Sequence, residues 1–467
     1  MTRTPVALLL LSITATLLAS CNSASPATAP APGAVPPITV TNPPVQSLPP
    51  NALPDPLVDH PGQVAPRFGF TAAMAIQSGD TVASMQAASG GTVLTWDDAS
   101  GALIGLNANK DGTAPSASSL SASLGRAVAV DANRDQLGAG GTITAVMSGS
   151  KIAWAGGNLS AWSAGSKIAW AGGEYTPIPQ NTQTWNAIHL QQAQTLAPNL
   201  GAGVVVAVID TGLDLDHVAF KDALTDQSTW WDFYGGDAVP QDEGTLGTGG
   251  YGHGTNVAGI ILQIAPKSKI MPLRVLGPDG SGDVSGIVSA INWAVAHGAK
   301  VINLSLGSAT NVKPINDALL AAAAKKVLTV TSAGNNSRGT LTYPAQNRYQ
   351  LPSLVSVASV DLMGLKSSFS NYGLATAVVA PGENVFAPAP GNMMASWSGT
   401  SQAAPMVAGG LALALGQTLK VPMMALPGAV SFSAANKIYT NSANWVYAAQ
   451  LGSGELDLAA LMSQTVK

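Results

Sequence analysis

From about residue 185 onward, the apolar residues of the chain follow two alternating patterns. Short unbroken apolar runs, such as 203–209, are typical of strands in a parallel sheet that is covered on both faces. Between several such runs, apolar residues recur at a helical spacing, as in 283–297. Further strands are expected at 270–276, 301–306, 327–331, 354–360 and 376–380, and further helices at 256–263, 314–326 and 406–415. The alternation predicts a doubly wound α/β fold over 185–467: a mostly parallel sheet with helices on both faces and a ligand site beyond the carboxyl ends of the strands.

The pattern of residues 68–180 is different. Short alternating runs are separated by Gly, Ser and Asp turns, and residues 92–106 predict a β-hairpin. The sequence Gly-Ser-Lys-Ile-Ala-Trp-Ala-Gly-Gly occurs twice, at 149–157 and 165–173. We interpret it as a duplicated strand whose Trp154 and Trp170 pack on one face, with an aromatic surface for a partner as the alternative. A smaller β-rich region is therefore expected before the α/β domain.

The start of the chain predicts export. Arg3 precedes an apolar run at 6–18, which is short for a membrane span, and two small residues then lead to Cys21, the single cysteine of the chain. This pattern is similar to a bacterial lipobox and predicts a lipoprotein signal peptide at 1–20 with lipidation of Cys21. An ordinary signal peptide and an uncleaved membrane helix are the alternatives. Residues 21–67 are rich in Pro and Ala and predict an extended tether, so the protein is expected at the cell envelope, or outside the cell after processing.

The composition argues against a disordered protein and against a nucleic-acid-binding protein. Of the 467 residues, 46% are hydrophobic and 10% are charged, with a formal net charge of −4, which suits a large folded core and not a disordered chain. No cluster of Lys and Arg is present to neutralise phosphates, so no nucleic-acid partner is expected.

Three polar segments with possible catalytic side chains lie at the ends of predicted strands or the starts of predicted helices. Asp210, in Asp-Thr-Gly, directly follows the strand at 203–209; His253, in Gly-His-Gly-Thr, precedes the helix at 256–263. Ser401, in Ser-Gly-Thr-Ser-Gln-Ala-Ala-Pro, precedes the helix at 406–415, where a helix N-terminus favours developing negative charge. A carboxylate, an imidazole and a hydroxyl can act as orienting acid, general base and nucleophile. An aspartic peptidase would need a second such aspartate motif, which the chain lacks.

Together these segments resemble the subtilisin-like serine peptidases (subtilases, peptidase family S8). The matching sequence motifs lie at 208–212, 253–259 and 399–405, and they follow the order Asp, His, Ser. The resemblance runs from about residue 185 to the C-terminus. It implies a serine endopeptidase that cleaves protein or peptide substrates through an acyl-enzyme, with Asp210, His253 and Ser401 as its triad and no cofactor required for chemistry.

The resemblance also implies a role for the segments around these residues. Asn335 would donate to the oxyanion together with the Ser401 backbone N–H, with Asn336 as the competing assignment. The edges that would bind the substrate backbone are Gly280, Ser281 and Gly282, then Ser305, Leu306 and Gly307, then Ser332, Ala333 and Gly334. Residues 68–180 would be either a removable propeptide, with a cut near 175–190, or a permanent domain.

The chain departs from the family pattern in two places. Asn256 stands where many relatives have a second histidine, and the loop that holds a tight calcium ion in many relatives is absent, so a structural calcium site is not supported by the sequence. Three rival readings remain open at this stage. They are a non-catalytic binding module with this fold, a sedolisin relative using Glu in place of His, and a metal-dependent hydrolase built from Asp210, Asp214, Asp216, His217 and His253.

Overall fold

The structure is a computed structural model that describes residues 68–97, 101–133, 136–138, 142–146, 179–245 and 249–467. Cys21, the expected signal peptide and tether, and both copies of the tryptophan-containing repeat lie outside these residues. No helix of the described part has the length and apolar character that crossing a membrane requires.

A seven-stranded parallel sheet forms the centre of the region from residue 179 onward, in the order β15-β14-β13-β11-β7-β9-β8. Every neighbouring pair in it is parallel. The strands are β7 (Val205–Asp210), β8 (Trp231–Asp232), β9 (Lys269–Arg274), β11 (Val301–Leu304), β13 (Leu328–Ser332), β14 (Leu354–Val360) and β15 (Val378–Pro381). Each strand expected from an unbroken apolar run is present. The edge strand β8 comes from the segment before His253 and was not expected.

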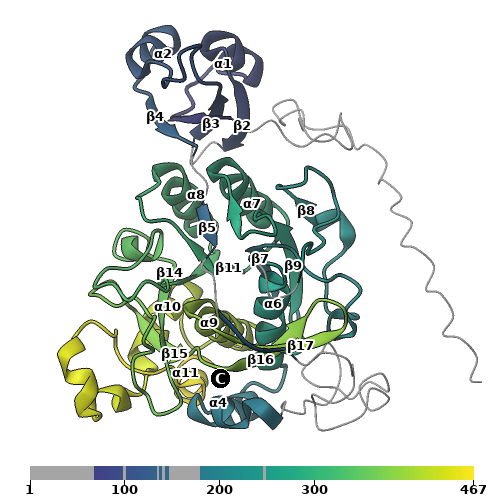
Figure 1. The fold of residues 1–467 in the computed structure, drawn as a ribbon, viewed down its shortest axis with the longest axis vertical. Coiled ribbons are helices and arrows are strands. Elements are labelled where there is room, and N and C mark those ends of the chain that lie inside the picture. Colours follow the sequence, from purple (N-terminus) through teal and green to yellow (C-terminus); the bar gives the residue numbers. More distant parts are fainter. Residues whose placement is uncertain (1–67, 98–100, 134–135, 139–141, 147–178, 246–248) are drawn as a thin grey trace, which may run out of the picture. The chain divides into compact units, whose positions relative to one another are not determined.

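Helices cover both faces of this sheet (Figure 1), as the alternating pattern predicts. The helices α6 (His253–Ile264) and α9 (Thr400–Leu415) cover one face, and α7 (Val284–Ala296) and α8 (Lys313–Ala324) cover the other. The side chains of β7 alternate between the two cores: Val206 and Val208 pack with α6 and α9, whereas Ala207 and Ile209 pack with α7 and α8. The doubly wound α/β fold is confirmed.

Shorter elements complete this domain. They are α4 (Thr182–Ala187), α5 (Leu190–Leu196), β10 (Ser281–Gly282), β12 (Leu306–Gly307), β16 (Val385–Ala389), β17 (Met393–Ser398), α10 (Leu426–Ser433) and α11 (Leu458–Thr465). Short 3-10 helices lie at Pro179–Asn181, Val218–Phe220, Gln227–Thr229, Ala345–Asn347, Met423–Ala425, Asn436–Tyr439 and Ser442–Tyr447.

The region before it contains an antiparallel sheet in the order β2-β3-β1-β4. The hairpin expected at 92–106 is β2 and β3. The structure adds two helices that the sequence pattern did not indicate, because each is short, buries few residues and depends on a side-chain cap from Thr81 or Ser116. In chain order the elements are β1 (Phe70–Met74), α1 (Val82–Ser89), β2 (Thr92–Asp97), β3 (Gly101–Leu106), α2 (Ala117–Leu124) and β4 (Ala129–Ala132).

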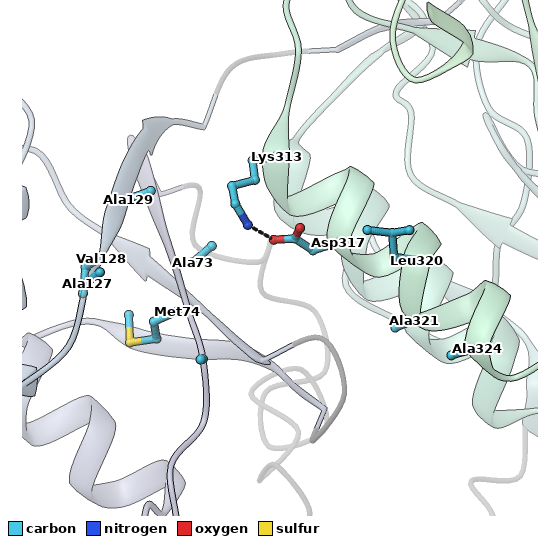
Figure 2. Close-up of a pocket in the computed structure, with 11 residues that line it drawn as sticks. Ala73, Met74, Ala127, Val128, Ala129, Lys313, Asp317, Leu320, Ala321 and Ala324 are labelled. Carbon is cyan, nitrogen blue, oxygen red and sulfur yellow. Dashed lines mark hydrogen bonds and ion pairs between the residues drawn. The ribbon is translucent and has the colours of Figure 1, made fainter. Parts of the chain in front are cut away.

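A cavity of about 520 Å³ lies where β1 and β4 face α8 (Figure 2). Figure 2 shows Met74 and Val128 on one side, and Leu320 and the ion pair between Lys313 and Asp317 on the other. The two surfaces are therefore not closely packed at this point. Beside the cavity, Leu103 of β3 is buried in the same core as side chains of α7 and α8.

Candidate active site

Asp210 and His253 meet at the carboxyl end of β7. His253 Nδ1 lies 2.7 Å from Asp210 Oδ1, and both side chains are buried, at 3% and 0% exposed. A carboxylate only accepts hydrogen bonds, so Nδ1 carries the ring proton and Nε2 is the basic nitrogen of the neutral ring. Asp210 Oδ1 also accepts from the Thr211 backbone N–H at 2.8 Å, which fixes the carboxylate on its strand end.

Small residues allow this close approach of α6 to β7. A Cβ atom on Gly254 would lie 2.2 Å from the Gly212 carbonyl oxygen and 3.1 Å from the Asp210 Cβ. The Gly254 N–H donates to Thr211 Oγ1 at 3.0 Å. The helix begins at His253 itself, earlier than the sequence pattern predicted, so His253 lies in its first turn.

Ser401 lies in the first turn of α9, whose start packs against the start of α6. The ring of Trp397, just before α9, meets the His253 ring edge-on with centroids 5.7 Å apart. Gln402, next to Ser401, donates through Nε2 to Asn256 Oδ1 at 3.3 Å. The departure at Asn256 therefore connects the two helices that carry His253 and Ser401.

Pro405 lies inside α9 and not before it, because the helix begins at Thr400, earlier than expected. A proline at this position cannot donate to the carbonyl of Ser401, four residues back. The Ser305 hydroxyl donates to that carbonyl at 3.0 Å instead, and the Ser401 hydroxyl contacts the Ser305 carbonyl at 3.3 Å. Two hydrogen bonds thus join Ser401 to the segment that leads into β12.

Asn335 follows β13 and is oriented by the residue before Ser401. Its Oδ1 accepts both the Thr400 backbone N–H, at 2.9 Å, and the Thr400 hydroxyl, at 2.8 Å. The Nδ2 end of the amide is therefore the donor end, as an oxyanion donor requires. The neighbouring Asn336 is held through its backbone N–H by Asn371 Oδ1 at 2.9 Å, away from this contact.

The expected substrate edges carry a strand of the chain itself. β5 (Gln136–Gly138) pairs antiparallel with β10 on one side and with β12 on the other. Beyond the active site, β6 (Thr142–Val146) pairs antiparallel with β17, which ends at Ser398. Segments on both sides of Ser401 are thus paired with the N-terminal region, and Ser401 itself is fully buried.

Asp242 is a residue of this site that the sequence analysis missed. Its carboxylate is buried and accepts from the Gly252 N–H at 3.1 Å and from the Thr255 hydroxyl at 2.7 Å. Its backbone N–H donates to the Leu213 carbonyl at 2.7 Å. Asp242 therefore links the loop after Asp210 to the helix start that carries His253. Burial raises the pKa of this carboxyl to about 7.

The residues proposed for a metal-dependent hydrolase do not form a metal site. His217 is buried, with Nε2 at 2.9 Å from the Met393 carbonyl and Nδ1 accepting from the Ala219 N–H at 3.0 Å. Asp214 accepts through Oδ2 from the Gly391 N–H at 2.8 Å. Across the described part of the chain, no three His, Cys, Asp or Glu side chains are grouped so that they could hold a metal ion.

Known proteins are similar to part of this chain in sequence and in fold. The sequence pattern described as the subtilase family matches residues 201–435. Subtilisin Savinase of Lederbergia lenta is 39% identical over 225 residues, which cover 46% of this chain and 76% of that protein. Thermitase of Thermoactinomyces vulgaris is 36% identical over 219 residues, covering 45% of this chain and 74% of that protein. Among solved structures, a protease from Pseudoalteromonas arctica has 26% identity and a TM-score of 0.51, covering 61% of this chain and 98% of that chain.

Proposed function

The chain belongs to the subtilase family and is a serine endopeptidase, and we propose that Asp210, His253 and Ser401 are its catalytic triad. The observation that carries the assignment is the 2.7 Å contact between His253 Nδ1 and Asp210 Oδ1, at a helix start packed against the one that holds Ser401. A carboxylate can also orient a metal-binding histidine, but no three His, Cys, Asp or Glu side chains in the described part of the chain are grouped to hold a metal ion.

On this proposal, each step of peptide hydrolysis is assigned to a group of the site. The Ser401 hydroxyl attacks the peptide carbonyl, His253 Nε2 takes its proton, and Asp210 stabilises the imidazolium through Nδ1–H. Asn335 Nδ2 and the Ser401 N–H donate to the oxyanion at the positive end of α9. The C–N bond then breaks as His253 returns the proton to the leaving amine, and water hydrolyses the resulting ester by the same route.

A covalent probe tests the triad. A fluorophosphonate should label the processed enzyme at Ser401 with loss of fluoride, and Ser401→Ala should remove both the label and casein hydrolysis. Ser463→Ala, at an exposed position of α11, serves as the matched control and should change neither. Labelling that survives in Ser401→Ala, or a processed wild type that hydrolyses casein without being labelled, would refute the assignment.

We propose further that the region at 68–180 blocks the cleft of the uncut chain and that its part up to residue 139 is a removable propeptide. β5 lies between β10 and β12 as a substrate strand would, and the pairing of β6 with β17 continues on the other side of Ser401. In this register Leu137 is opposite Gly307 and Gly138 is opposite Leu306. The next residue of a peptide so bound would be opposite Ser305, which contacts Ser401. In the sequence, Ala139 follows Gly138, so we propose that the enzyme cuts its own chain between Ala139 and Gly140.

The fate of the full chain tests this proposal. Wild type should yield a fragment that begins at Gly140, whereas Ser401→Ala should stay intact. N-terminal sequencing distinguishes this cut from one near 175–190, which the sequence analysis expected. An active enzyme in which all of 68–180 remains attached would support the permanent-domain alternative.

We also propose that the protein is exported and anchored by acyl chains on Cys21, which would place the protease at the cell envelope. The support is the sequence pattern at 1–21 and the Pro-rich stretch that follows it. Metabolic labelling with a fatty acid should mark the wild type and not Cys21→Ser. A Cys21→Ser variant that still carries the label would refute the anchor.

A further inference from the structure

The most exposed large hydrophobic side chains of the described residues include three that lie close together on the α/β domain. Met363 follows β14, and Trp445 and Val446 lie in the 3-10 helix at Ser442–Tyr447. These side chains are 73%, 64% and 74% exposed, more than any large hydrophobic side chain described outside 349–446. With Leu362, which is 45% exposed, they form a surface that we call the apolar patch.

The two segments that carry the apolar patch are joined side by side. Asn444 Nδ2 donates to the Gly364 carbonyl at 2.7 Å, and Asn444 Oδ1 accepts from the Lys366 backbone N–H at 3.1 Å. Asn444 directly precedes Trp445, and Gly364 directly follows Met363. The patch is therefore one surface built from two neighbouring loops, near the end of the central sheet opposite β8 (Figure 1).

A cation and two aromatic rings stabilise these loops beside the patch. Lys366 Nζ lies 5.3 Å from the centre of the Tyr372 ring and 5.1 Å from the centre of the Tyr447 ring. The two rings meet edge-on with centroids 4.7 Å apart. The Trp445 indole N–H donates to the Tyr439 carbonyl at 2.9 Å, so its ring is oriented although most of it faces solvent. Side chains held in this way lose less conformational entropy when a partner covers them.

The charge around the apolar patch favours an anionic partner. The stretches 338–374 and 431–450, which carry the patch, contain four basic residues and one acidic residue: Arg338, Arg348, Lys366, Lys437 and Asp361. Asp361 Oδ1 accepts from two backbone N–H groups of its own loop, each at 2.8 Å, and the neighbouring Glu455 is buried. The chain as a whole has a formal net charge of −4, so these stretches are basic against an acidic average.

We infer that the apolar patch docks the protease domain on a membrane surface that contains anionic lipids. Tryptophan is enriched at the level of the lipid headgroups, and smaller apolar side chains beside it enter the boundary of the acyl chains. The nearby lysines and arginines would meet the negatively charged headgroups. This inference goes beyond the proposed function. A cut anywhere between β4 and α4 would separate Cys21 from the protease domain, and the patch would then keep the domain at the envelope.

A second copy of the chain fits the same surface less well. A symmetric dimer through the patch would bring the basic side chains of one copy against those of the other, and like charges across an interface are unfavourable. Anionic lipids would instead neutralise these charges. The lipid surface is therefore the partner that the combination of exposed apolar side chains and positive charge fits best.

Vesicle binding tests the inference in a chain that starts at Asn22 and carries Ser401→Ala. This chain keeps every described element, has no cysteine to acylate and, on the proposed mechanism, does not digest itself. It should co-sediment with vesicles of phosphatidylethanolamine and phosphatidylglycerol. Binding should weaken as salt is added, and it should be much weaker on vesicles of phosphatidylcholine alone, because the electrostatic attraction is then screened or absent.

Substitutions in the patch should weaken this binding. Trp445→Ser combined with Val446→Ser should lower the partition coefficient by at least about tenfold, because both side chains lose their apolar contact with the lipid. Leu362→Ser combined with Met363→Ser tests the other loop and serves if the first pair does not fold. Lys437→Gln removes one exposed cation and should lower the partition coefficient by about fivefold.

Val239→Ser and Lys300→Gln are the matched controls, since both side chains are exposed and lie outside the two stretches, and they should leave binding unchanged. A parent chain that does not bind the anionic vesicles, or equal binding by both pairs of patch substitutions, would overturn the inference. A dimer that the patch substitutions dissociate, without any vesicle binding, would assign the surface to a second copy and would also overturn it. The readout does not depend on catalysis, so failure of the proposed function is distinct.

Discussion

The chemistry of single residues at this site depends on which of their atoms are already engaged. Thr400 uses both of its donors on Asn335 Oδ1, and this leaves the amide oriented with Nδ2 as the donor. The sequence could identify Asn335 as the oxyanion donor only through the family resemblance, and the adjacent Asn336 was a competing assignment. Folding separates the two, because only Asn335 is oriented by the residue next to Ser401.

Replacing Asn335 should therefore act on the transition state. Asn335→Ala should lower kcat by about a hundred- to a thousandfold with little change in KM, because the donor contacts the oxyanion and not the ground-state substrate. Asn336→Ala is the adjacent control, and its kcat should stay within a few fold of wild type. Steady-state kinetics with a chromogenic peptide measure both. Equal losses in the two variants would contradict the assignment.

Asp242 should make stability depend on pH. In the folded protein burial raises the pKa of this carboxyl from 3.8 to about 7. Between these values the folded state holds a proton that the unfolded state has released, so the contribution of Asp242 to stability is complete below 3.8 and is lost as pH rises from there through about 7. At ~1.4 kcal/mol per pH unit, the loss is on the order of 4 kcal/mol.

Denaturant unfolding of Ser401→Ala chains, with and without Asp242→Asn, measures this effect from pH 4 to 8. The free energy of unfolding should fall more steeply with pH when Asp242 is present. Parallel curves for the two chains would show that this carboxyl does not titrate in that range. Asp232, whose pKa burial raises to about 6, is present in both chains and cancels in the comparison.

At the scale of elements, unbroken apolar runs and helical spacing were enough to predict the central sheet and its covering helices. They could not give the helix starts, since Gly254 and the Ser-Gly-Thr-Ser segment lack the apolar residues that define a pattern. They could not predict β5 either. This three-residue strand is too short to show a pattern and is stabilised only by its pairing with β10 and β12.

The start of α6 should be sensitive to a single methyl group. Gly254→Ala places a Cβ atom 2.2 Å from the Gly212 carbonyl oxygen, so the helix must move away from Asp210. We expect a loss of about 1–3 kcal/mol in stability together with a large loss of activity. Gly286→Ala in α7 is the control, because the nearest atom to its Cβ would be 3.7 Å away.

The control should gain up to ~1 kcal/mol, as alanine does over glycine inside a helix. Thermal unfolding in the Ser401→Ala background compares the two substitutions. A Gly254→Ala chain as stable as its parent would show that the approach of α6 to β7 is not tight.

At the scale of the whole molecule, the N-terminal region meets the α/β domain in two different ways. Its sheet packs on α7 and α8 through Leu103 and leaves a cavity of about 520 Å³ beside α8, whereas β5 and β6 pair backbone to backbone along the cleft. Only the paired segments lie along β10, β12 and β17, so they are expected to keep the cleft closed.

Breaking the pairing of β5 should open the cleft without any cut. Leu137→Pro removes a backbone N–H and disfavours a strand between two neighbours. In the Ser401→Ala chain, hydrogen exchange at β10 and β12 should become faster, while exchange in β14 stays unchanged. Unaltered protection of β10 and β12 would show that β5 does not cover them in solution.

β6 differs from β5 in what happens to it once the bond after residue 139 is cut. The chain runs on from β6 into the α/β domain, so this strand stays covalently attached while β5 leaves with the released fragment. If the proposed cut occurs, β6 would compete with substrates for pairing along β17 in the mature enzyme, at a local concentration on the order of millimolar. An unfolded polypeptide that extends beyond the cleaved bond can displace β6 by pairing with β17 over many residues. A short peptide substrate does not extend to β17. Such an enzyme would cleave a substrate faster the further its chain extends on the leaving-group side of the cleaved bond.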